Sequence, residues 1–206
     1  SIKIFEILKK LKMKPVIIKK NYTDQIDEIL LIKKYSKIIT STKRKDAIEE
    51  AIQKKFNIII MDDGFQDFSI KKNINIICFN STQKIGNGFT VPAGPLRHSL
   101  RSLRSCHAIF INGGKDTEFE IKLKQYNKNI EFIYYDYIPE NISEFKNDKL
   151  IAFAGIGNPE NFFKLIESYD LNLLKKIKYP DHYNYNNSDL DYLIDLKKKN
   201  KARLVT

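Results

Sequence analysis

Short runs of apolar residues alternate along this chain with longer segments whose apolar residues recur at helical spacing, and this alternation constrains the fold most. The first half predicts helices over residues 2–12, 24–35 and 43–55 and strands over 15–18, 37–40 and 57–62. Further strands are predicted over 74–79, 108–112 and 130–135. Strands that are apolar on successive residues and separated by helices indicate a parallel sheet covered on both faces. We therefore predict an α/β fold.

A second block with its own alternation begins at the strand KLIAFAG. The segment that follows offers Asn158 as the cap of a helix whose first residue is Pro159. Further on, Ser188 with Asp191 is predicted to open an amphipathic helix. The lysine-rich segment between the blocks predicts a core domain and a smaller C-terminal α/β domain, over residues 1–142 and 143–206.

The charge of the chain bears on its partners. Lysine and arginine number 36 against 25 aspartate and glutamate residues, a formal charge of +11. This surplus favours an anionic partner such as nucleic acid, anionic lipid or a phosphorylated substrate. Heavy use of lysine, isoleucine and asparagine throughout fits a codon bias equally well. The cysteines form no CxxC pair, and Cys78, within an apolar run, is predicted to be buried.

The stretch NIIIMDDGFQDF drives a predicted strand directly into two carboxylates, Asp62 and Asp63. Ligands of open α/β sheets bind beyond the carboxyl ends of the strands. A single aspartate there commonly caps a helix or forms a loop salt bridge. Two in succession, followed by Gly64 with its wider choice of backbone conformations, favour a Mg²⁺ site, because Mg²⁺ prefers hard oxygen ligands that it shares with phosphates.

The loop GNGFTVPAGPLR is a second candidate site. The backbone N–H groups of Gly86, Gly88 and Gly94, together with the forked guanidinium of Arg97, could hold a phosphate. An ordinary omega loop is the alternative.

The segment YPDHYNY contains Asp181 and His182, which are adjacent in the sequence. A histidine beside a carboxylate can accept a proton or orient the group that does. A solvated loop histidine is the alternative. His98 and His107 lack such a setting and are interpreted as surface or structural residues.

Five motifs in this order resemble the tetraacyldisaccharide 4'-kinase family of lipid A biosynthesis. They are DDGFQ at 62–66, GNG and PAGPLR within 86–97, INGG at 111–114, AFAGIGNPENFF at 152–163 and YPDH at 179–182. The resemblance covers essentially the whole chain. It implies a P-loop kinase fold with a smaller C-terminal domain, at the cytoplasmic face of the bacterial inner membrane. The implied reaction moves the γ-phosphoryl group of ATP to the 4'-hydroxyl of an acylated disaccharide 1-phosphate and gives lipid IVA.

The resemblance also implies roles for individual residues. Asp62 and Asp63 match the family's Walker-B-like Mg²⁺ site, and Gly64 gives this turn room beside ATP. Asp27 matches the catalytic aspartate, which pairs with the histidine matched by His182. Arg44 and Arg97 are expected near phosphates. Phosphoryl transfer requires in-line positioning, charge neutralisation and a base that takes the proton of the acceptor hydroxyl.

The chain departs from the family pattern at several places. It contains no GxxxxGK[ST] motif, KNY at Lys20 to Tyr22 stands where the family has RGY, and Ile26 replaces the glycine before the catalytic aspartate. Because the chain starts at Ser1 and stops at LVT, we expect an internal piece of a longer protein that by itself neither binds ATP well nor turns over. The alternative function is a nucleotide-dependent binding or regulatory protein without catalysis. A nucleic-acid partner is not predicted, because no motif that reads nucleic acid is found.

Overall fold

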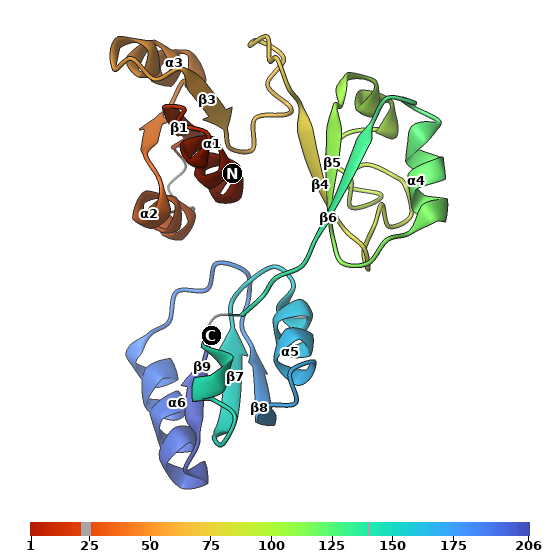
Figure 1. The fold of residues 1–206 in the computed structure, drawn as a ribbon. Helices are drawn as coiled ribbons and strands as arrows, with labels where there is room; N and C mark the ends of the chain where they lie inside the picture. The colour runs from red at the N-terminus through yellow and green to blue at the C-terminus, as the bar shows by residue number, and fades with distance from the viewer. Residues whose placement is uncertain (22–25, 140) are drawn as a thin grey trace. The chain divides into compact units, whose positions relative to one another are not determined.

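The computed structural model describes residues 1–21, 26–139 and 141–206 (Figure 1). Contacts within the chain divide it into two compact units, Ser1–Tyr137 and Ile138–Thr206. The domain boundary placed after residue 142 from the sequence stays a prediction. The first residues of the helix predicted over 24–35 lie outside the described residues.

The first unit begins with a parallel sheet of three strands in the order β2-β1-β3. Its strands and helices are α1 (Ile2–Lys10), β1 (Pro15–Lys20), α2 (Ile26–Tyr35), β2 (Ile38–Ser41), α3 (Arg44–Gln53) and β3 (Ile58–Met61). Successive residues of β1 face opposite sides. Val16 and Ile18 pack in one core with Ala47 and Ala51 of α3, whereas Ile17 packs in another with residues of α1 and α2. This confirms the prediction of a parallel sheet covered on both faces for these strands.

The same unit contains a second parallel sheet in the order β4-β5-β6. Its elements are β4 (Ile76–Asn80), the 3-10 helix η1 (Leu100–Ser105), β5 (Ala108–Asn112), α4 (Thr117–Lys124) and β6 (Glu131–Tyr135). Ile109 and Ile111 lie on the face that packs with Phe119 of α4. On the other face Cys78 is exposed and Ile133 is 43% exposed. The prediction that Cys78 is buried is therefore wrong, because Cys78 lies on an edge strand, and this second face of the sheet is only partly covered.

The parallel strands of the first unit form two sheets rather than one. Within the described residues no ladder joins β3 to β4. The connection between them, residues 62–75, contains no helix. Neighbouring parallel strands of one sheet are usually linked by a crossover helix. A connection without a helix therefore fits a chain that passes from one sheet to the next.

The second unit is a smaller α/β body with strand order β8-β7-β9, all parallel. Its elements are the 3-10 helix η2 (Ile142–Glu144), β7 (Lys149–Ala154), α5 (Pro159–Glu167), β8 (Asn172–Lys178), α6 (Asn187–Asn200) and β9 (Arg203–Val205). The core packs Phe163 of α5 with Leu150 and Ala152 of β7. As predicted, α5 starts at Pro159 after Asn158. No helix in the described parts of the chain is long and apolar enough to cross a membrane.

The start of α6 differs from the prediction that Ser188 with Asp191 opens it. The N-cap is Asn186, whose side-chain oxygen accepts a hydrogen bond from the Asp189 N–H at 3.0 Å. In return the Asp189 carboxylate accepts from the Asn186 N–H at 3.0 Å. The capping pair is thus Asn186 with Asp189, two residues before the predicted pair of Ser188 with Asp191, and an amide takes the place of the hydroxyl.

Candidate functional site

The predicted site at the end of β3 is built around a buried lysine. Asp62 follows β3, and its N–H donates to the carbonyl of Ile18 on the neighbouring strand β1. Lys19, the next residue of β1, is only 4% exposed. Its Nζ lies 2.9 Å from Oδ2 of Asp62 and 2.5 Å from Oε2 of Glu28 on α2. One cation therefore joins both strands to the helix.

This arrangement fixes the charges of Lys19 and Asp62. Burial alone would lower the pKa of Lys19, but hydrogen bonds to Glu28 and Asp62 and their negative charges outweigh it and raise that pKa. Burial alone would raise the pKa of Asp62, but hydrogen bonds from Ser1 and Lys19, and the charge of Lys19, leave it lowered. Asp62 is thus held as a carboxylate at the strand end.

Asp63 is held differently. Its backbone has a φ of 48°, in the left-handed region. Its two carboxylate oxygens lie 2.7 and 2.9 Å from Nη1 of Arg97. Gly64 has no such φ; a Cβ added there would lie 2.5 Å from Cβ of Met61. The glycine is therefore required by close approach to β3, and the unusual backbone conformation belongs to Asp63.

Arg44, the first residue of α3, reaches across to the same turn. Its Nη2 donates to the carbonyl of Asp63 at 2.7 Å, and its Nη1 lies 3.3 Å from Oδ2 of Asp67. Its Nε is buried, with no partner in the described residues. Hydrogen bonds from Ser69 chiefly, and then from Arg44, lower the pKa of Asp67. Arg44 thus ties α3 to the turn.

Lys72 binds the backbone of the same turn. Its Nζ donates to the carbonyls of Gly64, Phe65 and Asp67 at 3.1, 3.1 and 2.6 Å. Burial lowers the pKa of this lysine; the Asp67 charge partly opposes this shift and the Arg44 charge adds to it. Three carbonyl acceptors on one ammonium fix the shape of the DDGFQ turn.

Some of these side chains line an open pocket of about 490 Å³. It is lined by Arg44, Asp63, Gln66, Asp67, Phe68, Arg97 and His98. The rings of Phe68 and His98 meet edge to face, with their centroids 5.9 Å apart. His98, interpreted from the sequence as a surface or structural residue, therefore belongs to the pocket wall.

The glycine loop does not form the phosphate cradle that its sequence suggested. The N–H groups of Gly86, Gly88 and Gly94 donate inside the loop, to the carbonyls of Gln83, Ile85 and Thr90. A Cβ on Gly94 would come within 2.4 Å of the Phe89 carbonyl oxygen. Internal bonding favours the omega-loop alternative, and from this loop Arg97 alone of the four predicted groups reaches the pocket.

The predicted catalytic pair falls on different units. Asp27 lies exposed in the first turn of α2, next to the residue that binds Lys19. His182 lies exposed in the second unit, with a φ of 53° and its N–H on the carbonyl of Gly155 at 3.1 Å. Their pairing stays a prediction. In the KNY segment, Tyr22 lies outside the described residues.

The turn that carries His182 packs on the end of β7. The Tyr179 N–H donates to the carbonyl of Ala154 at 2.9 Å. Tyr179, Tyr183 and Tyr185 cluster here, with ring centroids 4.8 to 5.4 Å apart. Aromatic packing therefore sets the shape of the His182 turn.

The carboxylates at the end of β3 fit a magnesium ion that arrives with a phosphate ligand. In the described parts of the chain, no three His, Cys, Asp or Glu side chains converge to hold a metal by themselves. Mg²⁺ commonly takes only one or two carboxylates and completes its shell with water and phosphate oxygens. Asp62, held ionised, and the adjacent Asp63 offer that donor set.

Sequence reasoning assigned no role to Lys19, Glu28, Asp67 or Lys72. Lys19 carried a usable signal, since a lysine directly after three apolar strand residues stands where parallel strands present ligand-binding groups. Lys72 carried none, because its role depends on the path of the turn.

The family described as LpxK, tetraacyldisaccharide-1-P 4'-kinase, matches residues 8–206. A tetraacyldisaccharide 4'-kinase of Pelagibacter ubique is 40% identical over 209 residues, which cover 100% of this chain and 67% of that protein. One of Rickettsia bellii is 36% identical over 182 residues, covering 87% of this chain and 56% of that protein. The chain thus spans between about half and two thirds of the length of these relatives.

One solved structure resembles the fold. The crystal structure of the "apo" form of LpxK from Aquifex aeolicus in complex with ATP aligns with a TM-score of 0.65 at 20% identity. The alignment covers 89% of this chain and 67% of that one. The likeness supports the predicted P-loop kinase-like parallel α/β fold.

Proposed function

The chain belongs to the tetraacyldisaccharide-1-phosphate 4'-kinase family, and we propose that the protein transfers the γ-phosphoryl group of ATP to the 4'-hydroxyl of a tetraacyldisaccharide 1-phosphate. The product would be lipid IVA, a step of lipid A biosynthesis. The proposed substrates are ATP with Mg²⁺ and an acylated disaccharide phosphate.

The observation that carries this proposal is the charge arrangement at the end of β3. An ionised carboxylate, Asp62, is fixed by Lys19 at 2.9 Å, and Asp63 lies next to two arginines, Arg44 and Arg97. Hard anionic oxygens beside arginine forks suit a nucleotide phosphate and its metal ion together. Each group alone has ordinary explanations. Asp63, Arg44 and Arg97 together line one open pocket, with Asp62 next to Asp63 in the chain, and this combination favours phosphoryl transfer.

We assign the following roles to these residues. Asp62 and Asp63 would hold Mg²⁺, which when bound neutralises charge on the phosphates. Lys19 would keep Asp62 ionised and directed toward the metal. Arg97, which must leave Asp63, and Arg44, which lines the same pocket, would bind phosphate oxygens.

Asp27 would take the proton from the acceptor hydroxyl, and His182 would orient Asp27. Such a base typically contributes about 10²- to 10⁴-fold to the rate. Because Asp27 and His182 belong to different units, the two units would have to close on the substrate, which would also exclude water.

We further propose a peripheral contact with the cytoplasmic face of the inner membrane. The acceptor is a lipid, so the enzyme has to meet a membrane surface to reach it. The formal charge of +11 supports this contact, since anionic leaflets attract lysine-rich surfaces.

The test is ATP-dependent phosphorylation of a tetraacyldisaccharide 1-phosphate by the full-length protein, read by mass spectrometry of the lipid product. Formation of the 4'-phosphorylated product, lost in Asp62→Ala and retained in Asp195→Ala on the exposed side of α6, supports the proposal. Folded protein that binds ATP and yields no product would instead support a nucleotide-dependent binding protein without catalysis.

A further inference from the structure

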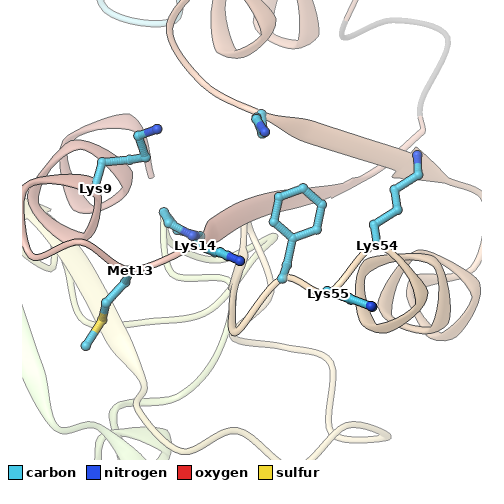
Figure 2. A pocket seen from close by; sticks show the side chains of 8 residues that line it. Lys9, Met13, Lys14, Lys54 and Lys55 are labelled. Atoms are coloured by element: carbon cyan, nitrogen blue, oxygen red, sulfur yellow. The ribbon is translucent and has the colours of Figure 1, made fainter.

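The first unit holds a second pocket, of about 400 Å³, away from the site described above. We call it the lysine pocket, and it is lined by Lys9, Met13, Lys14, Pro15, Lys37, Lys54, Lys55 and Phe56. Figure 2 shows Lys9, Lys14 and the adjacent pair Lys54 and Lys55 at different places around it. Five of its eight lining residues are cationic, which sets it apart from a general basic surface.

The lysine pocket lies at the amino edge of the first sheet. Pro15 begins β1, Lys37 directly precedes β2, and Phe56 lies shortly before β3. Asp62 follows the carboxyl end of β3. Since a strand of six residues is roughly 20 Å long, this pocket is a whole strand length from the proposed ATP phosphates.

Little negative charge offsets these lysines. The lining contains no aspartate or glutamate. Lys54 pairs with Glu50 at 2.5 Å, and Lys37 lies over the ring of Phe56 with Nζ 5.6 Å from its centroid. Like charges held around one cavity repel one another, and a bound anion relieves that repulsion. The arrangement therefore favours a ligand with more than one negative charge.

Lys55 has a left-handed backbone conformation, in which a glycine is readily accommodated. Lys55 follows the C-cap of α3 with a φ of 59°, at a position that favours glycine. Lys12 occupies the equivalent position after α1, with a φ of 60°, but does not line the pocket. It provides a matched control.

From this geometry we propose that the lysine pocket is a binding site for a multiply charged phosphate group, separate from the catalytic site. Lysine ammonium groups act as point charges with three donors each and suit phosphate oxygens approached from several sides. The group can come from a soluble phosphate compound or from an anionic lipid headgroup. Both sources present the same chemistry to the pocket.

The test uses the full-length protein and two probes. Pyrophosphate binding is measured by calorimetry, and binding to vesicles of phosphatidylglycerol or phosphatidylcholine is measured by sedimentation. In each arm the unchanged protein is compared with Lys55→Gly, Lys12→Gly and Arg97→Gln. Lys55→Gly removes one pocket charge and relieves the backbone, so loss of binding cannot be assigned to misfolding.

We expect Lys55→Gly to weaken one pyrophosphate-binding event about fivefold, whereas Lys12→Gly and Arg97→Gln leave that event unchanged. A pocket-dependent loss in the pyrophosphate arm identifies a soluble ligand. The same loss confined to phosphatidylglycerol vesicles identifies a lipid headgroup. Equal effects of Lys55→Gly and Lys12→Gly, or no effect of Lys55→Gly in either arm, would overturn the proposal.

Discussion

Nη1 of Arg97 lies 2.7 Å from one carboxylate oxygen of Asp63 and 2.9 Å from the other, although 34 residues separate them in the chain. The pair is well exposed, with 67% of the Arg97 side chain accessible. A pair this open gives little stability and separates easily. A metal ion could therefore take the place of Arg97 at the Asp63 carboxylate, and a phosphate could take the place of the carboxylate at Arg97.

Arg97→Gln is expected to lower kcat/KM for ATP by about ten- to a hundredfold, because a charged hydrogen bond to a phosphate is lost. The melting temperature should change little, since the pair is exposed. Steady-state kinetics and thermal unfolding of the full-length protein check both points. Arg101→Gln, an exposed arginine of η1 outside the pocket lining, is the control. Equal losses in both variants would remove the assigned role.

Asp62→Asn is expected to lower the free energy of unfolding by about 2 kcal/mol near neutral pH, because Lys19 stays buried with Glu28 as its remaining acidic partner. Denaturant unfolding measures this, with Asp195→Asn as control. A loss below about 0.5 kcal/mol would mean that water replaces the carboxylate.

The pH dependence of stability follows from the same contact. The pKa of Asp62 is lowered from its ordinary 3.8. Its contribution is therefore present above that value and is lost as the pH falls through the lowered pKa. The pKa of Lys19 is raised from 10.5, so its contribution is present below that value and is lost as the pH rises through the raised pKa. The unfolding free energy of Asp62→Asn should accordingly fall less steeply than that of the unchanged protein below about pH 4.

Gly64→Ala is expected to destabilise the protein by about 1 to 3 kcal/mol, since the new methyl group would lie 2.5 Å from Cβ of Met61. Gly114→Ala is the matched control, because a Cβ there meets nothing within 4 Å. Chemical denaturation of both variants gives the comparison. Indistinguishable midpoints would show that the turn relaxes around the added carbon.

Asp27→Asn and His182→Gln are each expected to lower kcat about 10²-fold or more, with circular dichroism unchanged. If His182 acts by orienting Asp27, the double variant should lose about as much as Asp27→Asn alone. Single-turnover kinetics separate this loss from substrate binding. Losses that multiply would show that the two residues act independently.

Asn186→Ala is expected to cost about 1 kcal/mol of stability, because the N-cap of α6 loses its side-chain acceptor. Ser188→Ala, at the cap expected from the sequence, should cost much less. Thermal unfolding of the two variants decides between the two cap positions.

The sequence predicts the parallel strands well because continuous apolar runs between helices have few other uses. It also locates Asp62, since a strand that ends on carboxylates is visible without a structure. It predicts neither the Arg97–Asp63 pair nor the Lys72 contacts, which depend on where two loops lie in space. Gly64 is an example. The sequence shows a glycine at this position, but only the structure shows that a side chain there would collide with Met61. The residue with the left-handed backbone conformation is Asp63.

Whether a strand is buried on both faces also depends on tertiary structure. Residues in β4 are as apolar as those in β1, yet Cys78 is exposed and Ile17 is fully buried. The apolar pattern predicts that a strand is present, but whether each face of the sheet is covered depends on which helix packs against it.

The packed rings of Tyr179, Tyr183 and Tyr185 give the turn that carries His182 an optical signature. The chain contains no tryptophan, so the near-ultraviolet circular dichroism of this chain comes from its tyrosines and phenylalanines. Rings held 4.8 to 5.4 Å apart in a fixed arrangement contribute strongly to such a spectrum. Substrate or nucleotide that reorders this turn would therefore change the spectrum, without any label attached to the protein.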